Sequence, residues 1–120
     1  VIDTLVNMLR NKELVDEQFM LSVYKRETMG ATLLQNEVGI PHGFPEHVNK
    51  SSIAIAKLTE PIEWEGGMKT DLVVLIAIKE NEKNNLAKIF KVFSKEKVRE
   101  LIRCATTSKE ILNIVLRDTK

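Results

Sequence analysis

An uninterrupted apolar run at residues 72–78, Leu-Val-Val-Leu-Ile-Ala-Ile, places the strongest limit on how this chain can fold. A strand with one face in water alternates between apolar and polar residues, and this run does not. It therefore predicts a central strand over 71–78 that is covered on both faces, as in α/β proteins. Residues 52–58 do alternate and predict a second strand, and shorter extended segments are expected at 37–41 and 61–64.

Apolar residues at helical spacing predict helices before and after these strands. Two helices are expected first, over 1–11 and 15–26. Three more are expected after residue 78, the second capped by Ser94 and the third opened by the capping-box pair Thr107 and Glu110. Helices, four short strands and more helices predict one α/β layered domain with a mixed sheet.

The bulk composition excludes several classes of function. The 120 residues carry 18 basic and 17 acidic side chains, without the basic excess of a nucleic-acid-binding domain. No apolar run approaches the roughly 18 residues of a membrane helix, and no signal-peptide pattern is visible. The single cysteine, Cys104, cannot form an internal disulfide, which predicts a reducing, cytoplasmic location. Cys104 lies in a helical pattern without a nearby histidine, so a small core or boundary residue is expected there.

The segment Ile40-Pro41-His42-Gly43 is the strongest candidate for chemistry. Proline holds the chain before it in an extended conformation, and glycine lets the chain turn sharply or approach a bound group. His42 is therefore presented at the end of a strand, where sites in α/β sheets gather. An imidazole there can accept and release a group near neutral pH, whereas the alternative is a histidine held by a turn hydrogen bond.

Two further elements could bind an anion. Arg26 could grip an anion through two hydrogen bonds, or could simply be a solvated cation at a helix end. A helix that starts near Asn84 could direct free N–H groups toward the sheet edge, although Asn84 and Asn85 are as easily plain helix caps. Thr32 could hydrogen-bond the imidazole or a phosphate, with a loop cap as the alternative.

The remaining candidates carry weaker signals. His47 follows five residues after His42, but no cluster of Cys, His and carboxylates has metal-ligand spacing, so no metal is expected. Trp64 could stack on a sugar, and an anchor in the core or at a sheet edge is the preferred interpretation. No Gly-rich phosphate loop or Ser/His/Asp order is visible, and no cofactor is expected.

Taken together, these motifs resemble the type-2 (mannitol/fructose-type) enzyme IIA domain of the bacterial phosphoenolpyruvate-dependent sugar phosphotransferase system. The resemblance covers nearly the whole chain and rests on the following segments: Arg26-Glu27, Thr32, Gly39-Ile40-Pro41-His42-Gly43, Ile53-Ala54-Ile55-Ala56, Pro61-Ile62-Glu63-Trp64, the run at 72–78, Leu101, and the closing segment 105–112. It implies a three-layer α/β sandwich, in which helices flank a mixed sheet on both faces.

The resemblance also implies a function and its partners. His42 would accept a phosphoryl group from phospho-HPr and pass it to an enzyme IIB domain, while Arg26 stabilises the phosphate. Phosphoryl transfer needs mainly positioning and charge stabilisation, which an arginine and backbone N–H groups can supply without metal. Neither direct nucleic-acid binding nor membrane insertion is expected of such a domain.

One position departs from the family pattern. Transport-type members usually carry a second histidine early in the helix after the buried strand, where this chain has Asn85. Asparagine can donate a hydrogen bond but cannot shuttle a proton. The loss is similar to that in IIA-like domains of BglG-type transcription antiterminators, whose activity is set by phosphorylation. A phosphoryl carrier, a regulatory module and a binding domain that has lost phosphotransfer therefore all remain open at this point.

The start of the chain also bears on its context. Residues 1–9 already follow helical spacing, yet no capping residue precedes them. We therefore expect residues 1–120 to be a type-2 IIA domain whose opening strand and helix start are missing. The chain would then be part of a longer protein, linked to regulatory or permease domains.

Overall fold

The computed structural model describes residues 1–29, 33–34, 38–65 and 68–118. They form two compact units, Val1–Lys83 and Asn84–Lys120, each of which is described by itself. The first unit holds a four-stranded sheet in the order β1-β2-β4-β3. Its strands are β1 (Leu33–Leu34), β2 (Val38–Gly39), β3 (Ser52–Glu65) and β4 (Met68–Ala77). β2 pairs with β4 in parallel, while β1–β2 and β3–β4 are antiparallel, so the sheet is mixed as expected.

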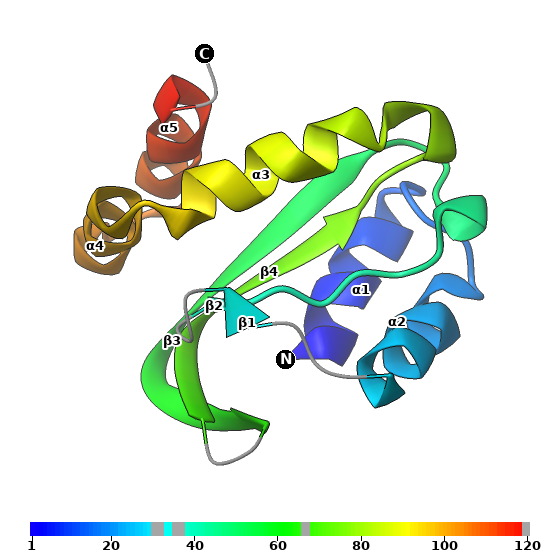
Figure 1. Ribbon diagram of the computed structural model, residues 1–120, viewed down its shortest axis with the longest axis horizontal. Helices are drawn as coiled ribbons and strands as arrows, with labels where there is room; N and C mark the ends of the chain where they lie inside the picture. The colour runs from blue at the N-terminus through cyan, green and yellow to red at the C-terminus, as the bar shows by residue number, and fades with distance from the viewer. Residues whose placement is uncertain (30–32, 35–37, 66–67, 119–120) are drawn as a thin grey trace. The chain divides into compact units, whose positions relative to one another are not determined.

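The apolar run forms the central strand that the sequence predicts. β4 lies between β2 and β3, with hydrogen-bonded neighbours on both edges (Figure 1). Every residue from Leu72 to Ala77 is at most 1% exposed, so side chains on both faces of the strand are buried. This continuous burial explains why apolar residues occupy consecutive positions instead of alternate ones.

The other strands differ from the expected pattern in two ways. The segments 52–58 and 61–64 belong to one long strand, β3, which pairs with β4 along most of its length. A register shift between Lys57 and Ile62 accommodates Pro61, which has no N–H to donate to a ladder. β1 was not predicted, because a two-residue strand carries no periodicity.

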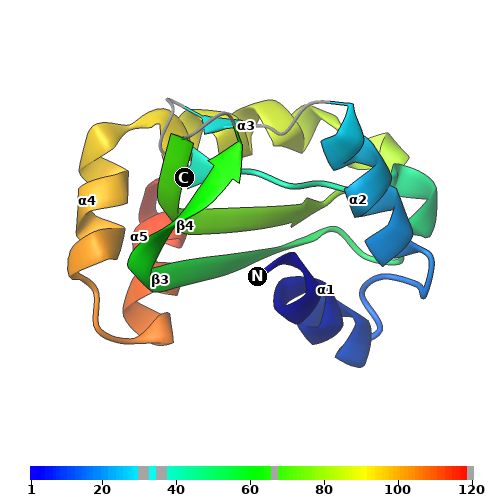
Figure 2. The same ribbon diagram turned by 90° about the horizontal axis from the view of Figure 1, so that it is seen from below.

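The helices α1 (Ile2–Asn11) and α2 (Phe19–Thr28) complete the core of the first unit. α1 contacts β3 and β4 (Figure 2). Apolar residues of both helices share one cluster with the strands: Leu5, Val6, Leu9, Phe19, Val23, Ala54, Val73, Leu75 and Ala77. α2 starts four residues later than expected, because Val15 forms a β-bridge with Val48 and the Asp16 side chain accepts the Gln18 N–H in a turn.

Two short 3-10 turns close the first unit, and three helices form the second. The turns are η1 (Pro45–His47) and η2 (Glu80–Glu82), and the helices are α3 (Asn84–Ser94), α4 (Glu96–Cys104) and α5 (Ser108–Asp118). The prediction that Ser94 caps α4 is wrong: its hydroxyl donates to the Lys91 carbonyl of α3, and Lys95 is the N-cap. The predicted cap of α5 is confirmed, because the Glu110 N–H donates to Thr107 Oγ1 at 3.1 Å.

Cys104 ends α4 and is exposed, so its expected place in or near the core is wrong. The helical pattern around it is correct, but the last turn of a short helix is less enclosed than its middle. Among the described residues, no helix is both long enough and apolar enough to cross a bilayer.

Gly39 provides a test of how closely the Trp64 side chain approaches β2. A Cβ at this position would lie 2.9 Å from Cε2 of Trp64, whose ring packs against the core as expected for an anchor. We expect Gly39→Val to lower the free energy of unfolding by about 1–3 kcal/mol, because the larger side chain overpacks the sheet. Urea unfolding followed by far-UV circular dichroism measures this loss.

The matched control is the same substitution in a Trp64→Leu background. Removing the indole relieves the clash. The loss in the double variant should therefore be smaller than the sum of the losses in the two single variants. Strict additivity would contradict the proposed contact.

Candidate functional site

His42 lies at the carboxyl end of the segment that starts with β2. The parallel register that joins Val38 to Leu72 and Gly39 to Val73 continues unchanged to a bridge between His42 and Ile76. The Ile76 N–H donates to the Pro41 carbonyl at 3.0 Å and holds the two chains together there. The expected position of His42 at the end of a strand is therefore confirmed, and its neighbour there is the buried strand β4.

The His42 imidazole is held by a backbone hydrogen bond. Its Nδ1 lies 3.2 Å from the Ile40 carbonyl oxygen. A carbonyl oxygen can only accept, so the neutral ring carries its proton on Nδ1 in this contact. The lone pair of Nε2 is then available to attack an electrophile.

The surroundings of His42 favour the neutral ring. Burial lowers the pKa of His42 below the usual 6.5, because desolvation penalises the charged form. The hydrogen bond to Ile40 raises this pKa in part, and the positive charge of Arg26 lowers it further. At neutral pH the ring is therefore unprotonated, which is the state that a nucleophile requires.

Arg26 lies in the last turn of α2, close enough to act on the charge of His42. The structure therefore brings together two residues that the sequence could not place relative to each other. Arg26 is half-buried, and its Nε is a buried donor without a hydrogen-bond partner among the described residues. A buried donor of this kind is costly unless a ligand satisfies it, which favours an anion at this place.

The loop after His42 is held against α2 by a residue that sequence reasoning missed. Ser22 is buried, and its Oγ accepts the Phe44 N–H at 3.0 Å while donating to the Phe19 carbonyl at 2.7 Å. Gly43 lies so close to the helix that a Cβ there would come within 2.6 Å of Ser22 Oγ. Ser22 and Phe44 had no signal in the sequence, because their contact joins positions 22 residues apart.

The proximity of two predicted site residues to His42 stays a prediction. Thr32 lies outside the described residues. Asn85 is exposed in the first turn of α3 and belongs to the second unit, as does Asn84 at the start of that helix.

His47 has a structural role in the first unit. Its Nδ1 lies 3.0 Å from Asp16 Oδ2, and the Asp16 N–H donates to the His47 carbonyl. The pair ties η1 to the turn before α2. Among residues 1–29, 33–34, 38–65 and 68–118, no group of three or more His, Cys, Asp or Glu side chains could hold a metal ion.

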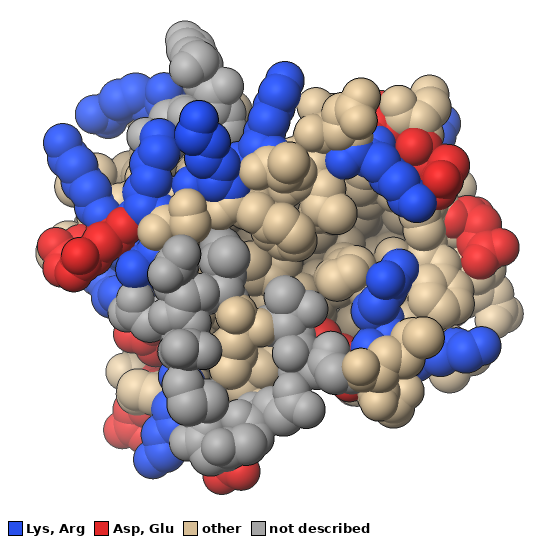
Figure 3. Space-filling model, in the orientation of Figure 1, with Lys and Arg blue, Asp and Glu red and all other residues tan. Residues whose placement is uncertain are grey.

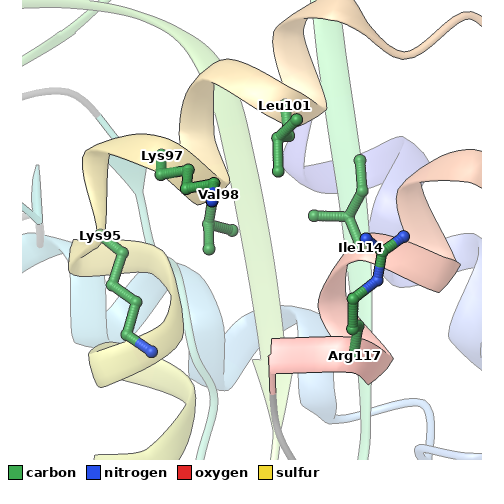
Figure 4. A pocket seen from close by; sticks show the side chains of 6 residues that line it. All are labelled: Lys95, Lys97, Val98, Leu101, Ile114 and Arg117. Carbon is green, nitrogen blue, oxygen red and sulfur yellow. The ribbon is translucent and has the colours of Figure 1, made fainter.

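Two hollows have linings that do not include these residues. One, of about 150 Å³, lies in the second unit and is lined by Lys95, Lys97, Val98, Leu101, Ile114 and Arg117 (Figure 4). Lys and Arg side chains gather over the helices of this unit in Figure 3. The other lies in the first unit and is lined by Pro45, Glu46, Lys79, Glu80 and Asn81. Neither is lined by His42 or Arg26, so the candidate site is not one of these hollows.

The fold and the site define an α/β domain that presents a neutral histidine beside a half-buried arginine. The family described as "Phosphoenolpyruvate-dependent sugar phosphotransferase system, EIIA 2" matches residues 1–118. The chain belongs to this family and is a type-2 enzyme IIA domain of the sugar phosphotransferase system.

Similar proteins occur in two contexts. The chain is 37% identical over 105 residues to the PTS system 2-O-alpha-mannosyl-D-glycerate-specific EIIABC component of Escherichia coli, and the match covers 81% of the chain and 16% of that protein. It is 34% identical over 94 residues to the transcriptional regulator ManR of Bacillus subtilis, covering 78% of the chain and 14% of the regulator. The chain thus spans about a sixth of the length of these curated relatives or less.

Solved structures show the same fold. IIA mannitol from Escherichia coli matches with a TM-score of 0.78 at 23% identity, over 95% of this chain and 85% of that one. The IIA domain in a complex of enzyme IIAMTL and phosphorylated enzyme IIBMTL from the same organism matches with a TM-score of 0.82 at 21% identity, over 97% of this chain and 85% of that one. The α/β class expected from the sequence is therefore confirmed.

The lowered pKa of His42 predicts how stability depends on pH. The folded protein binds this proton less readily than the unfolded chain does. The contribution of His42 to the free energy of unfolding is therefore fully present above about pH 6.5, and it is lost as pH falls through the folded pKa. We expect His42→Gln to flatten this part of the curve. Urea unfolding from about pH 7.5 to about pH 5 measures it.

NMR titration of the His42 ring provides the direct check. Its midpoint should fall below 6.5. A midpoint at or above that value, together with an unchanged stability curve in His42→Gln, would contradict the neutral ring.

Proposed function

We propose that His42 is the phosphoryl acceptor of this domain. The main support for this proposal is the hydrogen bond from the neutral ring to Ile40, because it leaves Nε2 free as the nucleophile. The Nε2 lone pair attacks the phosphorus of a phosphohistidine on the donor protein, a new N–P bond forms, and the N–P bond of the donor breaks. The electron pair returns to the donor imidazole, and the His42 proton stays on Nδ1.

Phospho-HPr is the proposed donor, and an enzyme IIB domain is the proposed acceptor. Arg26 stabilises the transferring group, because its charge acts on His42 and its buried Nε has no partner among the described residues. The complex of a similar IIA domain with phosphorylated IIB supports the second step. The proposed working location is the cytoplasm, where these partners would meet the domain.

Asn85 favours a second candidate function. In place of a second histidine it cannot carry a positive charge to offset the charge of the transferring group, so onward transfer would be slow. The domain would then act as a regulatory module, in which the charge on His42 sets the activity of linked domains. Similarity to both an EIIABC component and a transcriptional regulator is consistent with either context, in which residues 1–120 are one domain of a longer chain.

Intact-mass analysis separates the two functions. The protein is incubated with phosphoenolpyruvate, enzyme I and HPr, with and without a IIB domain. One acid-labile phosphate that then moves to IIB indicates a carrier. A phosphate that comes only from phospho-IIB, or that comes from HPr and moves no further, indicates a regulatory receiver. No phosphate from either donor would contradict both.

The first substitution to test is His42→Ala. We expect it to abolish labelling, because it removes the proposed nucleophile. His47→Ala is the matched control and should label normally, since that ring only pairs with Asp16. Labelling that survives in His42→Ala would overturn the site.

The second substitution is Arg26→Ala. We expect labelling to slow by about 100-fold, as when a preorganised donor is removed from a charged transition state. Arg10→Ala is the control, because Arg10 also lies in the last turn of a helix but in α1. Equal rates for the two variants in rapid-quench labelling would remove Arg26 from the site.

A further inference from the structure

Phe44 is joined to the helix that carries Arg26. Its backbone N–H donates to Ser22 Oγ, and this hydroxyl in turn donates to the Phe19 carbonyl. Ser22 and Phe19 belong to α2, as Arg26 does. The position of Phe44 relative to Arg26 is therefore set by one helix and two hydrogen bonds.

Gly43 makes this attachment close. A Cβ at Gly43 would lie 2.4 Å from Cε1 of Phe19, a distance at which atoms clash. The chain between His42 and Phe44 thus runs directly against α2. The backbone of Gly43 and Phe44, which follows His42 directly, is therefore held against α2.

The Phe44 ring contacts two cations of α2. The guanidinium carbon of Arg26 lies 5.4 Å from the ring centroid, and Lys25 Nζ lies 5.9 Å from it. Both distances are in the range of cation–π contacts. An aromatic ring attracts a guanidinium through its face and leaves the N–H donors in the guanidinium plane free. A carboxylate would instead accept hydrogen bonds from these donors and neutralise the charge.

We infer that Phe44 is a positioning residue for phosphoryl transfer: its ring holds the Arg26 guanidinium beside His42 while leaving the N–H donors for phosphoryl oxygens. This inference rests on the proposed function. It explains how Arg26 can have a buried, unpartnered Nε and still keep a defined place. In the sequence, Phe44 is marked only by its position directly after the His42-Gly43 turn.

The test compares Phe44→Met, which keeps apolar volume but has no ring face, with Phe44→Trp, which keeps the face. We expect Phe44→Met to lower kcat for labelling by phospho-HPr by about 10- to 100-fold, as for a misplaced catalytic group, with little change in KM. Phe44→Trp should keep most of the rate of the unchanged protein. Phe90→Met in α3 is the matched control and should label like the unchanged protein.

A second readout is independent of phosphoryl transfer. Arg26 is the charged side chain that lowers the pKa of His42, so an Arg26 released by Phe44→Met should let that pKa rise. NMR titration of the His42 ring measures this, and Arg26→Ala sets the upper limit. In an Arg26→Ala background, Phe44→Met should change neither the pKa nor the rate, because the partner is gone.

The outcomes separate this inference from the proposed function. If the unchanged protein takes no phosphate, the proposed function fails, and the titration alone decides the position of Arg26. If it is labelled and Phe44→Met changes neither kcat nor the pKa of His42, the inference is overturned. An effect confined to KM would make Phe44 a contact for the donor protein and would also overturn it.

Discussion

The site depends on the parallel pairing of β2 with β4. This pairing runs in one register from Val38 to His42, and the hydrogen bond between Pro41 and Ile76 closes it. β4 is buried along this stretch and cannot move without disturbing the core. The position of His42 is therefore set by a strand that is buried on both faces.

Much of this arrangement could be read from the sequence. The apolar run predicted the central strand because its burial on both faces leaves a direct trace in composition. Pro41 and Gly43 predicted that His42 ends a strand, because each restricts or frees the backbone locally. The capping pair Thr107 and Glu110 is a local signal of the same kind, and there too prediction and structure agree.

The rest depends on contacts between distant residues. The sequence named Arg26 as a cation but could not bring it to His42, since their proximity requires α2 to pack beside the strand. Ser22 and Phe44 were missed for the same reason: a buried hydroxyl and a ring after a turn acquire roles only through tertiary contact. Ser94 shows the converse, because a residue suited to capping one helix instead bonds back to the previous one. Thr32 stays a prediction.

The bond from Nδ1 of His42 to the Ile40 carbonyl has a consequence for how a modified domain would be sensed. Attachment of a phosphoryl group to Nε2 leaves this hydrogen bond in place, so the ring need not rotate or move. The two states would then share one shape and differ by almost two negative charges. A partner could distinguish them only through its own cations and ordered dipoles, and its discrimination would weaken as salt is added. Such a domain transmits an electrostatic signal instead of a conformational one.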